Sequence, residues 1–289
     1  MFGVVCPGQG SQKAGMLIPW LGTAEGKTLL SKFSEAAGLD LVHLGTKAEA
    51  EEISDTAIAQ PLIVAASLLS YRLSITAPVT VIAGHSVGLI TAFALAESFD
   101  DQTAIRLATI RGQLFRDVTV QSDSGMSAVI GKNVLPIFES LNLPLDIAVV
   151  NSESQIVVAG SQKALAELSL AVPRGLRVTP LKVSGAFHTE AMRPVLEPLA
   201  GVLNNTEIES PMIPVISDLT GEIITGEVAD HLLAQITNPV RWDLVTNQLG
   251  KFACEPDVTD AEIVELAPSG TMTALLKRAL PKVQITALP

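Results

Sequence analysis

The sequence predicts an α/β fold: a large domain built on a parallel sheet, with a small ferredoxin-like domain inserted into it. Val79–Ala83 is a β-branched run without polar alternation, which is typical of a parallel strand buried on both faces. From Met126 to Val183 the expected order of elements becomes β-α-β-β-α-β, the ferredoxin-like pattern. We therefore expect residues 1–120 and 188–289 to form the large α/β domain and residues 121–187 to form the small one.

The first part of the chain is expected to begin with a short buried strand that ends in the glycine-rich turn Pro7–Gln12. One of the helices that follow should start at Pro61, because proline suits the first helical position, where its missing N–H would have no acceptor. The elements expected up to residue 117 are a strand at 2–6, helices at 24–37, 47–53 and 61–73, the strand Val79–Ala83, and helices at 89–97 and 101–117.

The inserted domain and the return to the large domain complete the expected order. The small domain should contain strands at Met126–Gly131, Leu145–Val150, Gln155–Ala159 and Leu176–Val183, and helices at 133–141 and 162–171. After His188 we expect further helices, the short segments Pro214–Ser217 and Glu262–Leu266, and helices at 228–236 and 271–279.

Composition excludes several classes of protein. Of 289 residues, 48% are hydrophobic and 17% charged, which excludes intrinsic disorder. With 30 acidic and 19 basic side chains the net charge is −11, which argues against nucleic acid or an anionic membrane as the main partner. The two cysteines, Cys6 and Cys254, form no motif and fit a reducing compartment. No basic segment precedes the first apolar run, and the apolar stretch Pro61–Leu69 is too short to span a bilayer, so we expect a soluble cytoplasmic protein.

A nucleophile candidate lies in Gly84-His85-Ser86-Val87-Gly88, which matches G-x-S-x-G between an expected strand and an expected helix. This turn is typical of a large domain of the α/β-hydrolase type, where the serine Oγ projects from a tight strand-to-helix turn. The two glycines remove the Cβ atoms that would collide there. The helix that follows directs its free N–H groups toward an oxyanion formed on Ser86. The alternative is a structural turn that happens to contain serine.

A serine nucleophile needs a base, and the chain has four histidines. His43 and His231 lie in helical segments and are expected to be surface or structural residues. His85 is adjacent to Ser86, so its side chain should point away from the Oγ and shape the turn. His188 follows the last strand of the small domain, where the chain re-enters the main sheet, and is the candidate that can face Ser86.

An ordinary hydrolase of this type also carries an acid that orients the imidazole, and an HGGG-type oxyanion loop. The sequence has no HGGG. The carboxylates between residues 86 and 188 fall in helices or in the inserted domain, so no third member of a triad emerges.

Several motifs occur together and in order along almost the whole chain, from Phe2 to about Lys277, and they resemble the malonyl-CoA:acyl carrier protein transacylases and the acyltransferase domains of fatty acid and polyketide synthases. The similarity is greatest to the free-standing transacylases of type II fatty acid synthesis. The motifs are Pro7-Gly8-Gln9-Gly10-Ser11-Gln12, the elbow 84–88, Arg111-Gly112, Asn151 with Gln155–Gly160, Ala186-Phe187-His188, and Gln235 with Asn238-Pro239-Val240-Arg241-Trp242.

The resemblance implies a ping-pong transfer of a malonyl group from malonyl-CoA to the phosphopantetheine thiol of acyl carrier protein, through a malonyl-serine. Ser86 would be the nucleophile and His188 the base, held by the backbone carbonyl of Gln235, which accounts for the missing acid. The backbone N–H groups of Gln9 and Val87 would form the oxyanion hole.

The resemblance also implies the residues that bind substrate. Arg111 would hold the malonyl carboxylate, since a guanidinium binds a carboxylate through two parallel hydrogen bonds. Helical spacing keeps Arg111 off the face of the helix that carries Arg106 and Arg116. Phe187 would crowd an α-methyl branch of the substrate, although one methyl group gives only about 1–3 kcal/mol of discrimination. His85 and Asn151 complete the expected substrate-binding group.

Two positions depart from the family pattern: Leu89 stands where the family usually has an acidic residue, and Arg116 where it has a glutamine. The resemblance implies no cofactor, because malonyl-CoA and CoA are substrate and product, and it implies acyl carrier protein as the partner of a monomeric enzyme. Carrier proteins are generally acidic, so docking on this acidic chain requires a local basic patch. The candidates for that patch are Lys182, Arg193, Arg241, Lys277 and Arg278.

Two other functions remain open at the level of sequence. The same elbow could serve a serine hydrolase or thioesterase, although Arg111 and the missing acid argue against this. A catalytically silent scaffold of a synthase complex is the third possibility, to which Leu89 could point.

Overall fold

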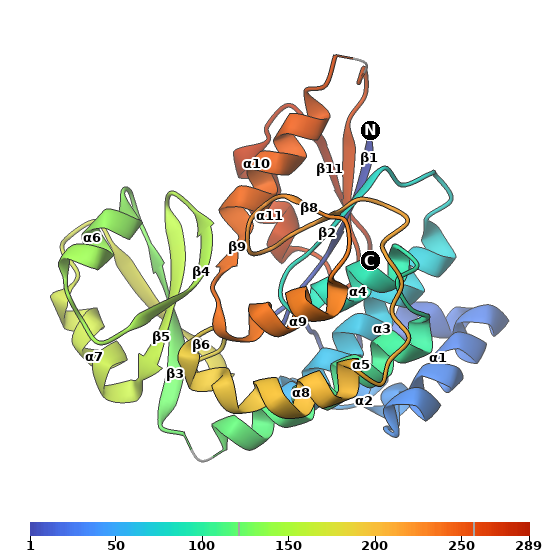
Figure 1. The fold of residues 1–289 in the computed structure, drawn as a ribbon, viewed down its shortest axis with the longest axis horizontal. Coiled ribbons are helices and arrows are strands. Elements are labelled where there is room, and N and C mark those ends of the chain that lie inside the picture. Colours follow the sequence, from blue (N-terminus) through green and yellow to red (C-terminus); the bar gives the residue numbers. More distant parts are fainter. Residues whose placement is uncertain (121, 257) are drawn as a thin grey trace.

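The computed structural model describes residues 1–120, 122–256 and 258–289, which form two sheets with their own helices (Figure 1). We refer to the six-stranded sheet with the helices packed on it as the large part. The five-stranded sheet, with α6 (Val134–Ser140) and α7 (Gln162–Ala171), is the small part. The described fold is therefore α/β with parallel strands. The expected domain boundary at residue 121 falls outside the described residues.

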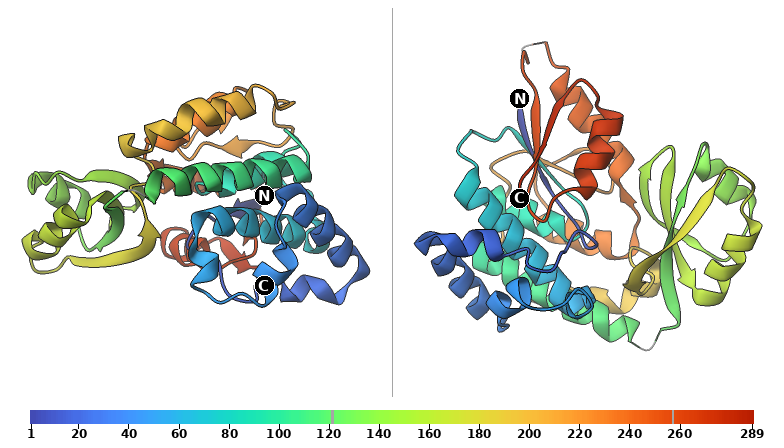
Figure 2. Two further views of the ribbon diagram at one scale, coloured as in Figure 1. Left: turned by 90° about the horizontal axis from the view of Figure 1, so that it is seen from below. Right: turned by 180° about the vertical axis from the view of Figure 1, so that it is seen from behind.

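The sheet of the large part has the strand order β11-β10-β1-β2-β7-β8, and all neighbours are parallel except the last pair. Its central strands are short and fully buried because helices cover both faces (Figure 2), and they read as apolar runs for the same reason. The strands are β1 (Phe2–Cys6), β2 (Val81–Gly84), β7 (Val215–Ile216), β8 (Ile223–Ile224), β10 (Glu262–Glu265) and β11 (Gln284–Ala287).

The helices of the large part carry or support the residues of the site. Helices α3 and α5 pack along one another, and α4 follows β2 directly (Figure 1). The helices are α1 (Ala24–Ala37), α2 (Leu41–Thr46), α3 (Thr56–Ser74), α4 (Gly88–Leu95), α5 (Asp101–Thr119), α8 (Leu196–Leu203), α9 (Val228–Thr237), α10 (Trp242–Ala253) and α11 (Thr271–Ala279), with 3-10 turns at Ile18–Gly22, Glu52–Ser54 and Glu190–Val195.

The sheet of the small part has the order β6-β3-β5-β4-β9. Its first four strands are antiparallel to their neighbours, and β9 is parallel to β4. A separate apolar core, which includes Val129, Ile156 and Leu168, fills the space between this sheet and its two helices. The strands are β3 (Ser124–Ile130), β4 (Asp146–Ser152), β5 (Gln155–Ser161), β6 (Arg177–Ser184) and β9 (Val240–Arg241).

Two expected helices differ from the structure. The helix expected from Pro61 begins at Thr56, because the side chain of Asp55 accepts a hydrogen bond from the N–H of Ala57 and caps the helix. Pro61 therefore lies inside α3, where a fully buried helix tolerates one lost backbone hydrogen bond. The helix expected at 47–53 is wrong: α2 ends at Thr46, and only a 3-10 turn lies nearby.

Other elements were not expected. Helix α10 and strand β11 have no counterpart in the sequence-based assignment, and neither do the two-residue strands β8 and β9. Short strands and a C-terminal edge strand carry too few residues for a periodic pattern to stand out.

Helix α3 is long and apolar enough to cross a membrane by length and composition, whereas the apolar stretch recognised in the sequence was shorter. In the structure, 78% of its most apolar window is buried against the rest of the fold. Its hydropathy reflects a position between α1, α4 and α5.

Candidate active site

Ser86 lies in the turn between β2 and α4, at the carboxyl end of a central strand of the large part. Its φ of 54° is in the left-handed region, as a tight strand-to-helix turn requires. A Cβ on Gly88 would collide with the backbone of Cys6 and Pro7, so glycine at this position lets the first loop pack against the turn. The local sequence thus brings the β1 loop beside the serine.

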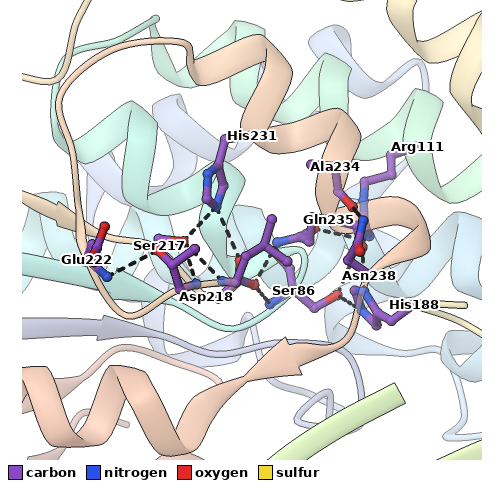
Figure 3. Close-up of polar contacts among 12 residues, drawn as sticks. Ser86, Arg111, His188, Ser217, Asp218, Glu222, His231, Ala234, Gln235 and Asn238 are labelled. Carbon is purple, nitrogen blue, oxygen red and sulfur yellow. Dashed lines mark hydrogen bonds and ion pairs between the residues drawn. The ribbon is translucent and has the colours of Figure 1, made fainter. Parts of the chain in front are cut away.

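His188 faces Ser86 as expected from the sequence. Its Nε2 is 2.8 Å from the Ser86 Oγ, and its Nδ1 is 2.8 Å from the backbone carbonyl oxygen of Gln235 (Figure 3). A carbonyl oxygen only accepts, so Nδ1 carries the proton and donates to Gln235, which leaves Nε2 free to accept from the serine hydroxyl. The Ser86 hydroxyl, the His188 ring and the Gln235 carbonyl thus form a continuous hydrogen-bonded chain, in which the imidazole can take the serine proton.

The protonation of His188 follows from its surroundings. Burial, together with the neighbouring positive charge of Arg111, lowers the pKa of His188 to about 4, and the hydrogen bond to Gln235 opposes this shift. The imidazole is therefore neutral near pH 7, which is the state that a general base requires.

Arg111 points from α5 into the site and is 3% exposed, whereas Arg106 and Arg116 on the same helix face solvent. Its Nη2 lies 3.3 Å from the Ser86 Oγ and donates to the Gln235 Oε1 at 3.1 Å. Burial lowers the pKa of Arg111, and the negative charge of Asp218 opposes this shift. A cation thus lies within reach of any acyl group on the serine.

Two aromatic rings line the wall beside this cation. The Arg111 guanidinium is 4.2 Å from the centre of the Phe115 ring, and Phe115 packs on Phe187 with 5.1 Å between ring centres. Phe115 has no counterpart in the sequence-based site. Its position four residues after Arg111, one helical turn further along α5, is the signal that could have found it.

A chain of side-chain hydrogen bonds links Arg111 to the loop Pro7–Gln12. Arg111 Nη1 donates to the Gln60 Oε1 at 2.7 Å, Gln60 donates to Thr56, and the Thr56 hydroxyl donates to the Gln9 side-chain oxygen at 2.9 Å. Gln60 is fully buried on α3. Sequence reasoning missed Gln60 and Thr56, although a glutamine one turn after a threonine inside a strongly apolar helix is an unusual pattern.

The two expected oxyanion donors come from the loop after β1 and from the turn that carries Ser86. In the described residues, the backbone N–H groups of Gln9 and Val87 have no hydrogen-bond acceptor, although Val87 is fully buried. Gly8 lies against the backbone of His85, and a Cβ there would collide with it, which places the Gln9 loop beside the elbow. Two unused donors are therefore present in the turn of Ser86 and in the loop packed against it.

Asp218 is the buried acid that the sequence did not reveal. Its Oδ2 accepts from the Ser86 backbone N–H at 3.1 Å and from the Gln235 Nε2 at 2.7 Å (Figure 3). The sequence-based search for an acid covered residues between the serine and His188. Asp218 lies after both, at the end of β7, and contacts neither side chain.

The remaining predicted residues lie outside this hydrogen-bonded network. The ring of His85 packs on Trp242, with 5.5 Å between ring centres. Asn151 lies on β4 in the small part, half-buried. Leu89 is fully buried in α4, and Arg116 is exposed and pairs with Asp55 at 3.5 Å.

The basic docking candidates separate into two groups. Lys182 on β6 and Arg193 shortly after His188 are exposed, and Arg193 pairs with Glu190 as Arg241 pairs with Asp243. Helix α11 begins beside Glu265, at the carboxyl end of β10, and runs back along the sheet. Lys277 and Arg278 are in its last turn. They therefore lie toward the amino-terminal ends of the parallel strands, whereas Ser86 lies at the carboxyl ends.

Two cavities on the described surface lie away from Ser86 and His188. The larger, about 1100 Å³, lies along α5 and the segment after α8, and the other, about 550 Å³, is lined in part by Ser217 and His231. In residues 1–120, 122–256 and 258–289, no group of three His, Cys, Asp or Glu side chains could hold a metal ion.

Comparisons with known proteins agree with this geometry. Residues 4–287 match the family described as "Acyl transferase domain". A Mycobacterium tuberculosis H37Rv protein named malonyl CoA-acyl carrier protein transacylase is 41% identical over 288 residues, which cover 97% of this chain and 93% of that protein.

Solved structures show the same fold. The crystal structure of MCAT from Mycobacterium tuberculosis has a TM-score of 0.92 and 40% identity, covering 100% of this chain and 96% of that chain. A type II PKS acyl-carrier protein in complex with its malonyl-transacylase has a TM-score of 0.87 and 29% identity, covering 99% of this chain and 95% of that chain.

Proposed function

Because the chain belongs to the acyl transferase family, we propose that it transfers a malonyl group from malonyl-CoA to the thiol of acyl carrier protein, with Ser86 as the carrier of the acyl group. The line from Ser86 through His188 to Gln235, with Arg111 beside it, is the observation that supports this proposal most strongly. Malonyl-CoA provides a thioester carbonyl for the serine to attack and a free carboxylate for the arginine to bind.

The first half-reaction forms the acyl-enzyme. His188 Nε2 takes the proton of the Ser86 hydroxyl while the Oγ attacks the thioester carbonyl, and the carbonyl oxygen becomes negatively charged. The N–H groups of Gln9 and Val87 stabilise that oxyanion. The carbon–sulfur bond then breaks, the CoA sulfur takes the proton from His188, and malonyl-Ser86 remains.

The second half-reaction runs the same steps with the carrier protein. His188 takes the proton of the phosphopantetheine thiol, the sulfur attacks malonyl-Ser86, and the oxyanion forms at the same two donors. The bond to the Ser86 Oγ breaks, and His188 returns the proton to the serine. No cofactor is needed, because the Ser86 hydroxyl, the His188 imidazole, and the sulfur atoms of CoA and of the carrier protein supply and accept every proton.

Arg111 and Phe187 account for the choice of acyl group. The guanidinium lies over the Phe115 ring, and a buried guanidinium favours an anionic acyl group over acetyl. The Phe187 ring restricts the space beside the α-carbon, and this supports a graded preference for malonyl over methylmalonyl. His85, packed on Trp242, and Asn151 on β4 would border the same substrate channel.

We further infer that the small part is a ferredoxin-like domain inserted into a hydrolase-like large domain, at residues 121–187. Its first four strands follow the order expected for β-α-β-β-α-β connectivity, and its core is separate from that of the large part. The acidic carrier protein would dock on Lys182 and Arg193, which are exposed on β6 and in the turn that follows His188. The enzyme would act as a monomer in the cytoplasm.

Labelling the acyl-enzyme tests the proposal. We expect radiolabelled malonyl-CoA to label the protein stoichiometrically at Ser86, and the label to move to holo acyl carrier protein on addition. Ser86→Ala should take up no label. Rapid loss of the label to water without carrier protein would indicate a hydrolase, and no labelling at all would indicate a silent scaffold.

A further inference from the structure

A carboxylate lies behind the nucleophile, and the reaction steps above do not use it. Asp218 is fully buried, and one of its oxygens holds both the Ser86 backbone and the Gln235 side chain (Figure 3). A buried carboxylate is costly unless it is paired and hydrogen-bonded, so its place in the centre of the site calls for a function.

The hydrogen bonds of Asp218 determine how the Gln235 amide is oriented. A carboxylate only accepts and a guanidinium only donates. The amide between them therefore presents its nitrogen to Asp218 and its oxygen to Arg111, at 2.7 and 3.1 Å. The same nitrogen also donates to the Ser86 carbonyl at 3.1 Å. The backbone carbonyl of Gln235 holds His188, and its side-chain oxygen holds Arg111. By fixing Gln235, Asp218 therefore helps to position both the base and the arginine that binds the substrate.

The negative charge of Asp218 acts on the same two groups. It raises the pKa of His188 and of Arg111 and so opposes the effect of burial on each. His188 becomes a cation each time it takes a proton from serine or thiol, and a nearby anion stabilises that cation. The same anion repels the malonyl carboxylate that arrives at Arg111.

We propose that Asp218 is a positioning residue of the transferase: its carboxylate orients Gln235 and the Ser86 turn, favours the cationic form of His188 during transfer, and weakens the binding of the malonyl carboxylate at Arg111. The proposal rests on the proposed function and extends it. Asp218 thus raises the rate of acyl transfer at the expense of substrate affinity.

The charged and titratable groups that face Asp218 come from four places in the fold. They are His85 beside the elbow, Arg111 on α5, His188 after β6, and His231 on α9, whose Nε2 is 3.7 Å from the Asp218 Oδ1. In the described residues, Oδ1 has no hydrogen-bond partner.

Asp218→Asn is therefore a conservative test. Its carbonyl oxygen can take the place of Oδ2 and keep both hydrogen bonds, and its NH₂ group takes the place of Oδ1, 3.7 Å from the His231 Nε2. The substitution removes the charge and keeps the shape. Its thermal unfolding is compared with that of the wild type to verify the fold.

The first experiment measures binding without turnover. In a Ser86→Ala background, titration calorimetry should show that Asp218→Asn binds malonyl-CoA several-fold more tightly, about threefold to tenfold, because a repulsion is removed. The affinity for acetyl-CoA, which has no carboxylate, should stay unchanged. Asp230→Asn, on the exposed face of α9, is the matched control for net charge and should change neither affinity.

The second experiment measures transfer with Ser86 intact. Asp218→Asn should slow single-turnover malonylation about tenfold, and should slow the reaction of Ser86 with a neutral fluorophosphonate to a similar extent. Asp218→Ala, which also removes the acceptor, should be slower still. Asp230→Asn should react at the wild-type rate.

The outcomes separate the two proposals. A slower Asp218→Asn enzyme with unchanged affinity for malonyl-CoA would reduce Asp218 to a structural role and overturn the inference, and so would an unchanged rate. A wild-type protein that is never malonylated at Ser86 would instead overturn the proposed function.

Discussion

The large and small parts contribute to the site in different ways. The large part supplies Ser86, Arg111, Gln235 and Asp218 from the ends of its strands and from two of its helices. The small part has a sheet and core of its own, and its strand β6 leads the chain back to His188. The candidate nucleophile Ser86 thus follows a buried strand of the parallel sheet and Arg111 lies on a helix of the large part, whereas His188, the candidate base, follows a strand of the small part. Catalysis depends on the relative position of the parts as well as on either one.

The strongest test of this comparison removes the candidate nucleophile Ser86 and, separately, the candidate base His188, which follows the last residues of β6. Ser86→Ala and His188→Ala should each lower malonyl transfer by about a thousandfold or more, because residues that act as a unit lose most of their effect together. The double variant should be little worse than either single one. Steady-state transfer to holo carrier protein measures all three. A well-tolerated His188→Ala would mean that His188 is not the base.

A second test concerns the cation of the large part. Arg111→Ala should lower kcat/KM for malonyl-CoA about a hundredfold while sparing acetyl-CoA, because only malonyl offers a carboxylate. Arg106→Ala, exposed on the same helix, is the matched control and should leave both substrates unaffected. Equal losses for the two substrates would assign Arg111 a structural role.

The independence of the small core can be measured by stability. Leu168→Ala, in α7, should lower the free energy of unfolding by about 2–5 kcal/mol, because it leaves a cavity in a fully buried position. Leu170→Ala, on the same helix and 89% exposed, should change it by less than about 0.5 kcal/mol. Denaturant unfolding gives both values. Activity of the folded Leu168→Ala protein should remain close to that of the wild type, and a large loss would show that the two cores are tightly coupled.

The pH dependence measures the coupling across the boundary. The pKa of His188 is lowered to about 4, so the rate of Ser86 with a neutral fluorophosphonate should stay level down to about pH 5 and fall to half near pH 4. Arg111 contributes to that lowering, so Arg111→Ala should move the midpoint to higher pH. A midpoint near 6.5 in the wild type would contradict the burial of the imidazole.

The smallest expected effect is on docking. Lys182→Glu with Arg193→Glu should raise KM for carrier protein a few-fold at low salt and less at high salt, because exposed charges act mainly on encounter. KM for malonyl-CoA should not change. Lys277→Glu with Arg278→Glu, toward the amino-terminal ends of the parallel strands, is the control pair. Equal effects of the two pairs would indicate that only total charge matters.

Much of this arrangement could be predicted because it depends on local signals. Ser86 was found from a strand–turn–helix motif, and His188 from its place where the chain returns to the main sheet. Arg111 and Gln235 required the resemblance to a family, since one arginine of three on a helix and one glutamine carry no periodic signal. Asp218, Gln60 and Phe115 could not be placed, because their function depends on contacts between segments far apart in sequence, and an isolated aspartate after a two-residue strand looks like a loop residue.

The two-residue strand β9 joins the parts in a way that matters for protein engineering. Val240 and Arg241 pair with β4, and the Arg241 N–H donates to the Asp218 carbonyl at 2.7 Å. A small part excised at the ends of β3 and β6 would lose this neighbour and expose the apolar edge of β4, which invites aggregation. A chimera that exchanges this part between related enzymes should therefore carry residues 240–241 along with it, as a second exchanged segment.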